Sequence, residues 1–322
     1  MDLSIFNSKS MKASHGLVCL AAAIALYFVA LEIVMRTVVP QISQVERHHI
    51  MDRQAASTLA RAGQDNVKSV LVVGNSLLQQ GIDRPLLANT TAPKHRVVVY
   101  PVENTTYWDW YFGLRRLLRE GAAPDVVVLC LNLRQALADT TNGEGFAHSL
   151  MWMGDLVSVT KASNLDLTGA SNYFFANISA WLGGRSFIRN WVLEKWVPDA
   201  NTLVQYFAPA GPGRSSQNSR AEKSRVLLQR LVALRDLCEA ADTHFVFLIP
   251  PSASGEDVTT EIQQLAAQAG ILVMVPFRAG ELDASAFSDG FHLSADGAKR
   301  FTARFARSIA DNELASPGVR KN

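Results

Sequence analysis

The sequence predicts an α/β protein, a three-layer α/β/α sandwich around a parallel sheet, with a helical insertion and an N-terminal transmembrane helix. From residue 67 onward, short apolar runs alternate with helical stretches, which is typical of βαβ units. These runs are continuous rather than alternating, as expected for parallel strands whose two faces are covered by helices. A third observation, an uncharged apolar segment near the N-terminus, predicts the membrane helix.

Composition excludes several classes of protein. The 322 residues are 48% hydrophobic and 19% charged, which supports one large core or two small ones and excludes a disordered chain. The 31 basic and 29 acidic residues give a formal net charge of +2, and no long run of Lys or Arg is present to neutralise phosphates. We therefore expect no nucleic-acid partner.

The three cysteines, Cys19, Cys130 and Cys238, have no C-x-x-C spacing and predict neither a zinc site nor a disulfide framework. Cys130 and Cys238 are either buried free thiols or the two ends of a bridge formed outside the cytoplasm. The sequence has no Gly-rich phosphate loop, nucleotide fingerprint or metal-ligand motif, so we expect no cofactor and no metal site.

The apolar N-terminal segment has no charge over residues 16–31. A membrane span needs about 20 mostly apolar residues. The segment reaches this length only if Glu32 and Arg36 lie at one interface, where their i,i+4 spacing lets them pair. The alternatives are a buried helix and a signal peptide with Lys9 and Lys12 as its basic region, although no small-x-small cleavage site follows.

Basic residues lie on both sides of the apolar segment, so the positive-inside rule does not settle its orientation. The short tail of residues 1–15 and the large remainder favour an inside tail and an exported body. We expect a single-pass protein of the inner (cytoplasmic) membrane, anchored by residues 16–39, with a periplasmic or extracytoplasmic body. Residues 40–66 predict a juxtamembrane stalk, in which His48 and His49 are expected to be an exposed polar pair rather than metal ligands.

The body is expected to span residues 67–314 and to be followed by a C-terminal tail, residues 315–322. Three helices are expected between the strands, at residues 107–119, 221–240 and 259–269. The expected strands are the five apolar runs at residues 69–73, 97–102, 125–131, 244–249 and 271–275.

Residues 139–224, between the third and fourth strands, are too many for a connection in such a fold and predict an insertion. The insertion holds four of the six tryptophans, Trp152, Trp181, Trp191 and Trp196, and a loose Gly/Pro/Ser-rich linker follows them. It is a lid or acceptor-binding element, a membrane-facing surface, or a helical appendage with its own small core.

A serine directly follows the first expected strand, in VLVVGNSLLQQ. Ligands of an open parallel sheet bind outside the carboxyl ends of its strands, where Ser76 and Asn132 are expected. Backbone N–H groups at the start of the next helix can face a developing oxyanion. Because serine is also a common helix N-cap, Ser76 predicts a nucleophile only if a base accompanies it.

The segment Asp289-Gly290-Phe291-His292 supplies the base. A serine nucleophile needs a base, and an imidazole base needs a third group that holds its tautomer. Asp289 precedes His292 by three residues, so both side chains can project from one side of a short turn. His148, in the insertion, is the reserve candidate. The other histidines precede the anchor, lie in the stalk or begin strands: His15, His48, His49, His95 and His244.

These blocks resemble the SGNH (GDSL-type) hydrolase superfamily, in particular its membrane-anchored bacterial branch that acts on cell-envelope polysaccharides. The family's strand and Gly-Asp-Ser block appears as VLVVGNS, with Asn75 in place of aspartate. Its Asp-x-x-His block appears intact as DGFHLSADG, and Gly-x-Asn-Asp is represented by CLNL, which keeps only Asn132. FVFLIPPS is similar to the family's strand before the final segment. The resemblance covers residues 67–309, apart from the insertion.

The resemblance implies a Ser-His-Asp mechanism, with Ser76 as nucleophile, His292 as base and then acid, and Asp289 as the orienting carboxylate. The N–H of Ser76 and the side chain of Asn132 are the implied oxyanion donors. The family's second block places a glycine N–H in the oxyanion hole, whereas YPVENTTYWDW has no glycine there. A backbone N–H needs glycine only where φ is positive or the approach is very close, so Asn104 or Thr105 is expected to donate instead.

Two function classes follow. The first is a membrane-anchored serine esterase or O-acyltransferase that removes or transfers an acyl group, expected to be acetyl, on an extracytoplasmic polysaccharide. A membrane-bound acyl-transfer or export component would be its partner. The second is a catalytically degenerate member of the superfamily that binds glycan or acts as a scaffold in a polysaccharide export or modification complex.

Overall fold

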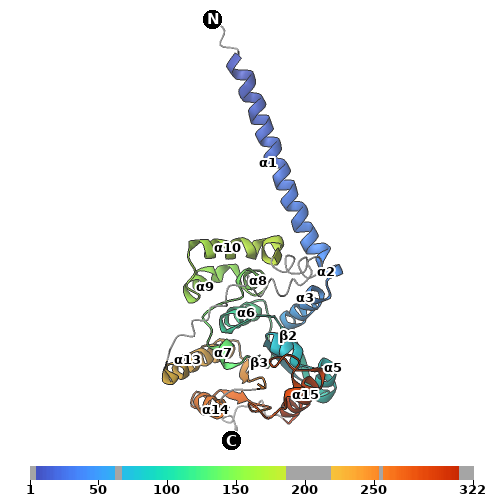
Figure 1. Ribbon diagram of the computed structural model, residues 1–322, viewed down its shortest axis with the longest axis vertical. Helices are drawn as coiled ribbons and strands as arrows, with labels where there is room; N and C mark the ends of the chain where they lie inside the picture. The colour runs from blue at the N-terminus through green and yellow to red at the C-terminus, as the bar shows by residue number, and fades with distance from the viewer. Residues whose placement is uncertain (1–4, 62–66, 186–218, 254–256, 312–322) are drawn as a thin grey trace.

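The computed structural model describes residues 5–61, 67–185, 219–253 and 257–311 (Figure 1). Its centre is a five-stranded sheet in which every pair of neighbours is parallel, with strand order β2-β1-β3-β4-β5. The strands are β1 (Lys68–Gly74), β2 (His95–Pro101), β3 (Val126–Cys130), β4 (His244–Leu248) and β5 (Leu272–Met274). All five expected strands are confirmed, with ends that differ by at most two residues.

Both faces of the sheet are apolar, as the continuous hydrophobic runs predict. Successive residues of β1 point to opposite faces, so Val70 and Val72 join one core cluster while Leu71 and Val73 join the other. Helices contribute to both clusters. The Leu71 side packs with α6 (Tyr107–Arg119), α13 (Arg220–Glu239) and α14 (Thr259–Ala267). The Val70 side packs with α4 (Ser76–Gly81), α5 (Arg84–Thr91) and α15 (Ala295–Ala310).

The three predicted helices are confirmed as α6, α13 and α14, and the structure adds α4, α5 and α15. α15 begins where the Ser294 hydroxyl accepts a hydrogen bond from the Gly297 N–H. Phe301, Phe305 and Ile309 lie at i, i+4 and i+8 and are fully buried. The i, i+4 and i+8 spacing of these apolar residues is the signal in the sequence that indicates this helix.

The insertion begins after α7 (Leu133–Ala136). Its described part contains α8 (Gly143–Ser149), the 3-10 turn η1 (Met153–Asp155), α9 (Leu156–Ala162) and α10 (Leu167–Ile178). Phe146 of α8 and Tyr173 of α10 belong to the same core cluster as Trp110 of α6. The prediction of an appendage with its own small core is therefore wrong, because these helices extend the main core. Trp191 and Trp196 lie outside the described residues.

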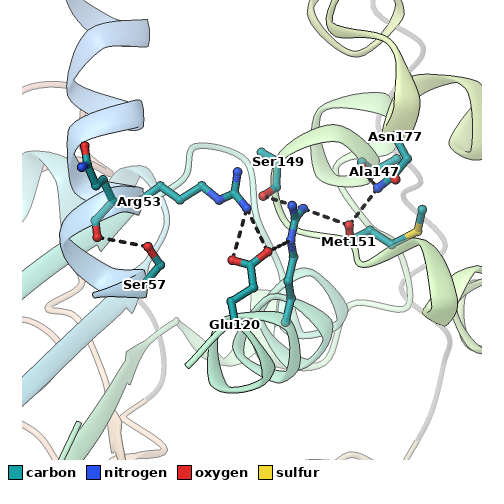
Figure 2. A network of polar contacts seen from close by, with 9 residues as sticks. Arg53, Ser57, Glu120, Ala147, Ser149, Met151 and Asn177 are labelled. Carbon is teal, nitrogen blue, oxygen red and sulfur yellow. Dashed lines mark hydrogen bonds and ion pairs between the residues drawn. The ribbon is translucent and has the colours of Figure 1, made fainter. Parts of the chain in front are cut away.

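A polar network holds the insertion to the body (Figure 2). Arg116 of α6 donates to the carbonyl oxygens of Ser149, at 3.3 Å, and Met151, at 3.0 Å. Its Nε also donates to Glu120 at 2.7 Å, and the same carboxylate accepts from Arg53 at 3.2 Å. One set of bonds therefore links the segment after α8, helix α6 and the N-terminal region.

The N-terminal region consists of α1 (Ile5–Thr37), α2 (Val39–Ile42) and α3 (Gln44–Ser57). α1 projects away from the body (Figure 1). Residues 15–41 are long and apolar enough to cross a membrane, and none of the most apolar window is buried. The buried-helix alternative is therefore wrong, whereas a span and a signal sequence both fit this segment.

α3 packs against β2, and Ala56 near its end is fully buried in the main core. The Asp52 carboxylate pairs with Arg84 of α5 at 2.6 Å. His48 is exposed as expected, but His49 is half-buried with its ring 5.5 Å from that of Tyr100, so the prediction of an exposed pair is wrong for His49. Burial lowers the pKa of His49 to about 4.

Cys130 and Cys238 are buried free thiols, which confirms the first alternative and excludes a bridge between them. Burial raises the pKa of the Cys238 thiol to about 12, so it stays protonated and unreactive.

Phe301 offers a test of the core formed by α15. Its fully buried ring stacks on Phe305 with the centroids 6.1 Å apart. Phe301→Ala should lower the free energy of unfolding by about 3–5 kcal/mol, because it leaves a cavity. Val157→Ala, at a side chain that is 67% exposed, should change it by less than about 0.5 kcal/mol. Denaturant unfolding of the detergent-solubilised chain measures both, and equal changes would contradict the assigned packing.

Candidate active site

Two neighbouring strands bring the candidate residues to one edge of the sheet. Gly74 of β1 lies opposite Cys130 of β3, and Ser76 and Asn132 each follow two residues later. The chain passes from β1 out to β2 and returns to the other side of β1 as β3, so the strand order reverses between β1 and β3. Such a switch point opens a crevice outside the carboxyl ends of the strands, where ligands bind in open α/β sheets.

Ser76, His292 and Asp289 form one hydrogen-bonded series, although Ser76 and His292 are 216 residues apart in the chain. His292 Nε2 lies 3.0 Å from the Ser76 hydroxyl oxygen, and His292 Nδ1 lies 2.7 Å from Asp289 Oδ2. Because the carboxylate accepts, Nδ1 carries the proton and Nε2 offers its lone pair to the serine. The structure thus brings together the three predicted residues in the order that proton transfer requires.

The turn that carries His292 is held by Asp289. Its Oδ1 accepts the backbone N–H of His292 at 2.6 Å and that of Phe291 at 2.9 Å, while Oδ2 contacts the imidazole. Gly290 has φ +79°, a conformation that glycine adopts without strain. The His292 N–H is the main cause that holds the pKa of Asp289 well below its usual range, followed by the imidazole. The carboxylate therefore stays ionised.

The base of this turn is closed by backbone hydrogen bonds. The Ser288 N–H donates to the His292 carbonyl at 2.8 Å, and the Ser294 N–H donates to the Ala286 carbonyl at 2.8 Å. A bridge between Phe287 and Leu293, both buried, joins the two sides of the turn. The imidazole thus projects from a short closed loop directly before α15, whose packing on α4 and α5 carries it to Ser76.

Asn75 caps α4, so the alternative in which Ser76 is only a helix cap is wrong. Asn75 Oδ1 accepts the Leu77 N–H at 3.1 Å, and Ser76 is the first helical residue with its hydroxyl directed to His292. Asn75 Nδ2 donates to the Thr105 carbonyl at 3.0 Å, and the Asn75 side chain is 1% exposed. An amide makes both bonds, whereas a carboxylate has no proton for the carbonyl. This explains why asparagine suits the position.

The second block is attached to the first through Thr105. The Thr105 hydroxyl donates to the Val102 carbonyl at 2.6 Å and accepts from Trp110 Nε1 at 2.9 Å, and its carbonyl accepts from Asn75. Asn104 has φ +58°, the left-handed region in which asparagine is the best tolerated residue after glycine. The segment after β2 therefore contains a left-handed position, at Asn104, without needing a glycine there. The sequence analysis did not identify Trp110 as part of this site. The available signal was a tryptophan that follows Thr105 by five residues.

The structure supports the predicted oxyanion donors less fully than it supports the Ser76–His292–Asp289 series. Asn132 Oδ1 accepts the Gln135 N–H at 2.9 Å as the cap of α7, which directs that oxygen to the helix and leaves the Nδ2 protons without an acceptor among the described residues. The N–H of Ser76, in the first turn of α4, has no acceptor inside the helix. The Thr105 carbonyl accepts a hydrogen bond from Asn75, next to Ser76, which ties the Asn104–Thr105 segment to the nucleophile's turn without using either residue's N–H. Their donor role stays a prediction.

His148 does not join this site. Its Nδ1 contacts the Ala176 carbonyl at 3.0 Å between α8 and α10, and burial lowers its pKa. His95 and His244 open β2 and β4, at the far ends of those strands, as expected. Within the described ranges, no group of three or more His, Cys, Asp or Glu side chains has the arrangement to hold a metal ion.

The surroundings of the triad include one feature that the sequence did not predict. Phe291 is 48% exposed, and its ring stands edge-on to that of His292 with the centroids 5.0 Å apart.

A separate cavity of about 1520 Å³ lies between the N-terminal helices and the body, with Asn104 and Gln79 among its lining residues. The lining does not include Ser76 or His292.

Comparison with models of known protein families finds no match, and comparison with curated proteins finds none either. The geometry of the site is therefore the basis on which its chemistry can be argued. A serine hydroxyl, an imidazole and an ionised carboxylate in hydrogen-bonded series at a sheet edge are equipped for nucleophilic acyl transfer.

Asn75→Asp tests the bond between the two blocks. The variant should lose about 1–3 kcal/mol of stability, because the Thr105 carbonyl would face an acceptor instead of a donor. Burial would raise the folded-state pKa of the new carboxyl above its unfolded value near 4. The carboxyl would therefore stay protonated to a higher pH in the folded state than in the unfolded state. Its stability should therefore fall as pH rises from about 4 towards that raised pKa.

Denaturant unfolding at about pH 5 and pH 8 measures this dependence. Asn89→Asp, at an exposed position on α5, is the matched control and should follow the wild type at both pH values. If Asn75→Asp is as stable as Asn89→Asp, the amide-to-carbonyl bond does not stabilise the site.

Proposed function

We propose that the protein is a membrane-anchored SGNH-type serine acyl hydrolase or O-acyltransferase that acts on O-acetyl esters of an extracytoplasmic polysaccharide. One observation carries the proposal: His292 contacts Ser76 at 3.0 Å on one side and Asp289 at 2.7 Å on the other. Helices packed on both faces of the parallel sheet, and the positions of the blocks at its carboxyl edge, support the three-layer SGNH-like assignment.

In the proposed reaction, Ser76 Oγ attacks the acyl carbonyl carbon and its proton passes to His292 Nε2. Asp289 stabilises the imidazolium and keeps its orientation. The negative oxygen of the tetrahedral intermediate is met by the Ser76 N–H and the Asn132 amide, with a backbone N–H of the Asn104 segment as a further donor. Collapse expels the sugar or donor alcohol, which takes the proton from Nε2 and leaves an acyl-Ser76 ester.

The second half of the reaction decides between hydrolysis and transfer. His292 takes a proton from water in an esterase, or from a sugar hydroxyl in a transferase, and that oxygen attacks the acyl-serine. The exposed ring of Phe291 beside His292 provides an apolar surface of the kind that lines ligand sites, which suits the apolar face of a sugar. The extracytoplasmic location and the polysaccharide substrate rest on the apolar α1 segment and on the family resemblance.

The alternative, a degenerate member that binds glycan or acts as a scaffold, is less well supported. It is expected to leave His292 turned into the core, whereas the imidazole here is directed to Ser76 and its side chain is 19% exposed.

Ser76→Ala is the direct test of the nucleophile. The full-length protein in detergent should hydrolyse p-nitrophenyl acetate and form a covalent adduct with a fluorophosphonate, and the variant should lose at least about a thousand-fold in rate. Ser308→Ala is the matched control, because Ser308 lies near the opposite end of α15 from His292. A wild type no faster than Ser76→Ala, and without adduct, would favour the binding or scaffold alternative.

Asp289→Asn tests the orienting carboxylate. The variant removes the acceptor that keeps the proton on Nδ1, so the rate should fall by at least about a hundred-fold even with the triad geometry intact. Because its hydrogen bonds keep the pKa of Asp289 well below the usual range, the loss should persist from about pH 6 to pH 9. Hydrolysis rates across that range measure it, and a variant that matches the wild type would show that Asp289 only shapes the turn.

A further inference from the structure

The outer face of α10 is apolar and exposed. Its 12 residues include no Asp, Glu, Lys or Arg. Leu167 is 85% exposed, Phe174 40%, Phe175 51% and Ile178 53%. Their spacing of i, i+7, i+8 and i+11 places them on one side of the helix. Isolated apolar side chains on a surface are ordinary, but a stripe with two phenylalanines indicates a surface that contacts a membrane or another protein.

The opposite face of α10 is already packed, so the stripe has no way to turn inward. Tyr173 and Ala176 are buried in the main core. Asn177 Nδ2 donates to the carbonyl oxygens of Ala147, at 2.6 Å, and Met151, at 2.8 Å, at the end of α8 (Figure 2). Met151 also accepts from Arg116 of α6, so this face of α10 belongs to the network that joins α8 to the body.

The end of α10 is attached to α1 where the apolar run of α1 stops. Glu32 is the first charged residue after the uncharged residues 16–31. Its carboxylate accepts hydrogen bonds from the Ala180 N–H at 2.8 Å and the Ser179 hydroxyl at 2.9 Å, directly after α10. It also pairs with Arg36 at 2.6 Å. If α1 spans a bilayer, these bonds hold α10 at the level of the interface.

The direction of the stripe follows from the arrangement of the helices. α10 lies across the direction of α1, on the side of the body from which α1 leaves, with α8 beneath it (Figure 1). Since the inner face of α10 packs on α8, its outer stripe faces the side towards which α1 extends.

We propose that α10 lies in the interface of the bilayer that α1 crosses, with its apolar stripe among the lipid headgroups and upper acyl chains. An amphipathic helix in this position buries its apolar face about 5–10 Å deep. The inference rests on the part of the proposed function that makes α1 a membrane anchor. Two attachments, rather than α1 alone, then set the height and rotation of the body above the membrane.

The occupant is the bilayer because the stripe lies beside the helix that would cross it. Met35 and Val39 of the N-terminal helices pack with Ala180, directly after α10. This apolar contact lies next to the polar group of Glu32, Arg36 and Ser179, which is where the uncharged run of α1 ends. The stripe itself carries no charge that a polar or ionic partner would recognise.

The test places a fluorophore on the stripe of the full-length protein. In a Cys19→Ser background, Phe174→Cys is labelled with an environment-sensitive nitrobenzoxadiazole dye, since Cys130 and Cys238 are buried. The protein is reconstituted in phosphatidylcholine vesicles that contain lipids spin-labelled near the headgroup or near the chain end. The emission should shift to the blue, and the label near the headgroup should quench more strongly.

Two further labelled positions separate the outcomes. Asn172→Cys is the matched control: Asn172 is exposed on the same helix and lies about 160° from Phe174 around the axis. It should show less quenching. Leu26→Cys in α1, where the side chain is 69% exposed, reports the anchor and should be quenched by the deeper label.

If Leu26→Cys is quenched and Phe174→Cys is not, the contact of α10 with lipid is overturned while the anchor stands, whether or not the Phe174 emission is blue. A blue emission without quenching means that protein, rather than lipid, covers the stripe. If neither position is quenched, the anchor fails and the proposal fails with it.

Discussion

The pairing of β1 with β3 is the constraint on which the candidate site depends. Because β3 returns to the opposite side of β1 from β2, the segments that follow β1 and β3 diverge and leave a crevice at the carboxyl edge of the sheet. The register of Gly74 with Cys130 sets Ser76 and Asn132 at the same height. Ser76 and Asn132 are far apart in the sequence, and without that pairing they would share no surface.

A second constraint brings the base to the nucleophile. His292 precedes α15 by three residues, and Phe301 and Phe305 of α15 are fully buried beneath the sheet together with Leu78 of α4. α15 and α4 are therefore held together by the same core. Burial of apolar side chains far from the site thus determines the distance between Ser76 and His292, and Asp289 adds only the local geometry of the turn.

The buried Asn75 amide links the serine to the rest of the body. It joins the cap of α4 to the Thr105 carbonyl, and Thr105 is itself fixed by the indole of Trp110. Loss of any of these hydrogen bonds would leave a buried polar group without a partner. The free-energy cost of that unpaired group is larger than the net stabilisation that the bond provides. The site, helix α6 and the insertion helices packed on α6 consequently form one connected unit that extends to Glu32 and α1.

Sequence periodicity was sufficient for the parts of this protein that depend on local chemistry. Continuous apolar runs determined the five strands, and the absence of charge over residues 16–31 determined an apolar helix long enough for a span. The Asp289–His292 spacing also determined the local pairing of carboxylate and imidazole, because both side chains lie on one short turn.

Contacts between distant segments were decided only by the tertiary structure. Whether Asn75 or Ser76 capped α4 depended on the Thr105 carbonyl, 30 residues away. Whether the insertion forms a separate core depended on the packing partners of Phe146 and Tyr173. Both side chains pack in the main core together with residues of α6. The burial of His49, in helix α3, depended on Tyr100, which belongs to strand β2. Local patterns encode which face of an element is apolar, but the partner of that face is set by the packing of the whole chain.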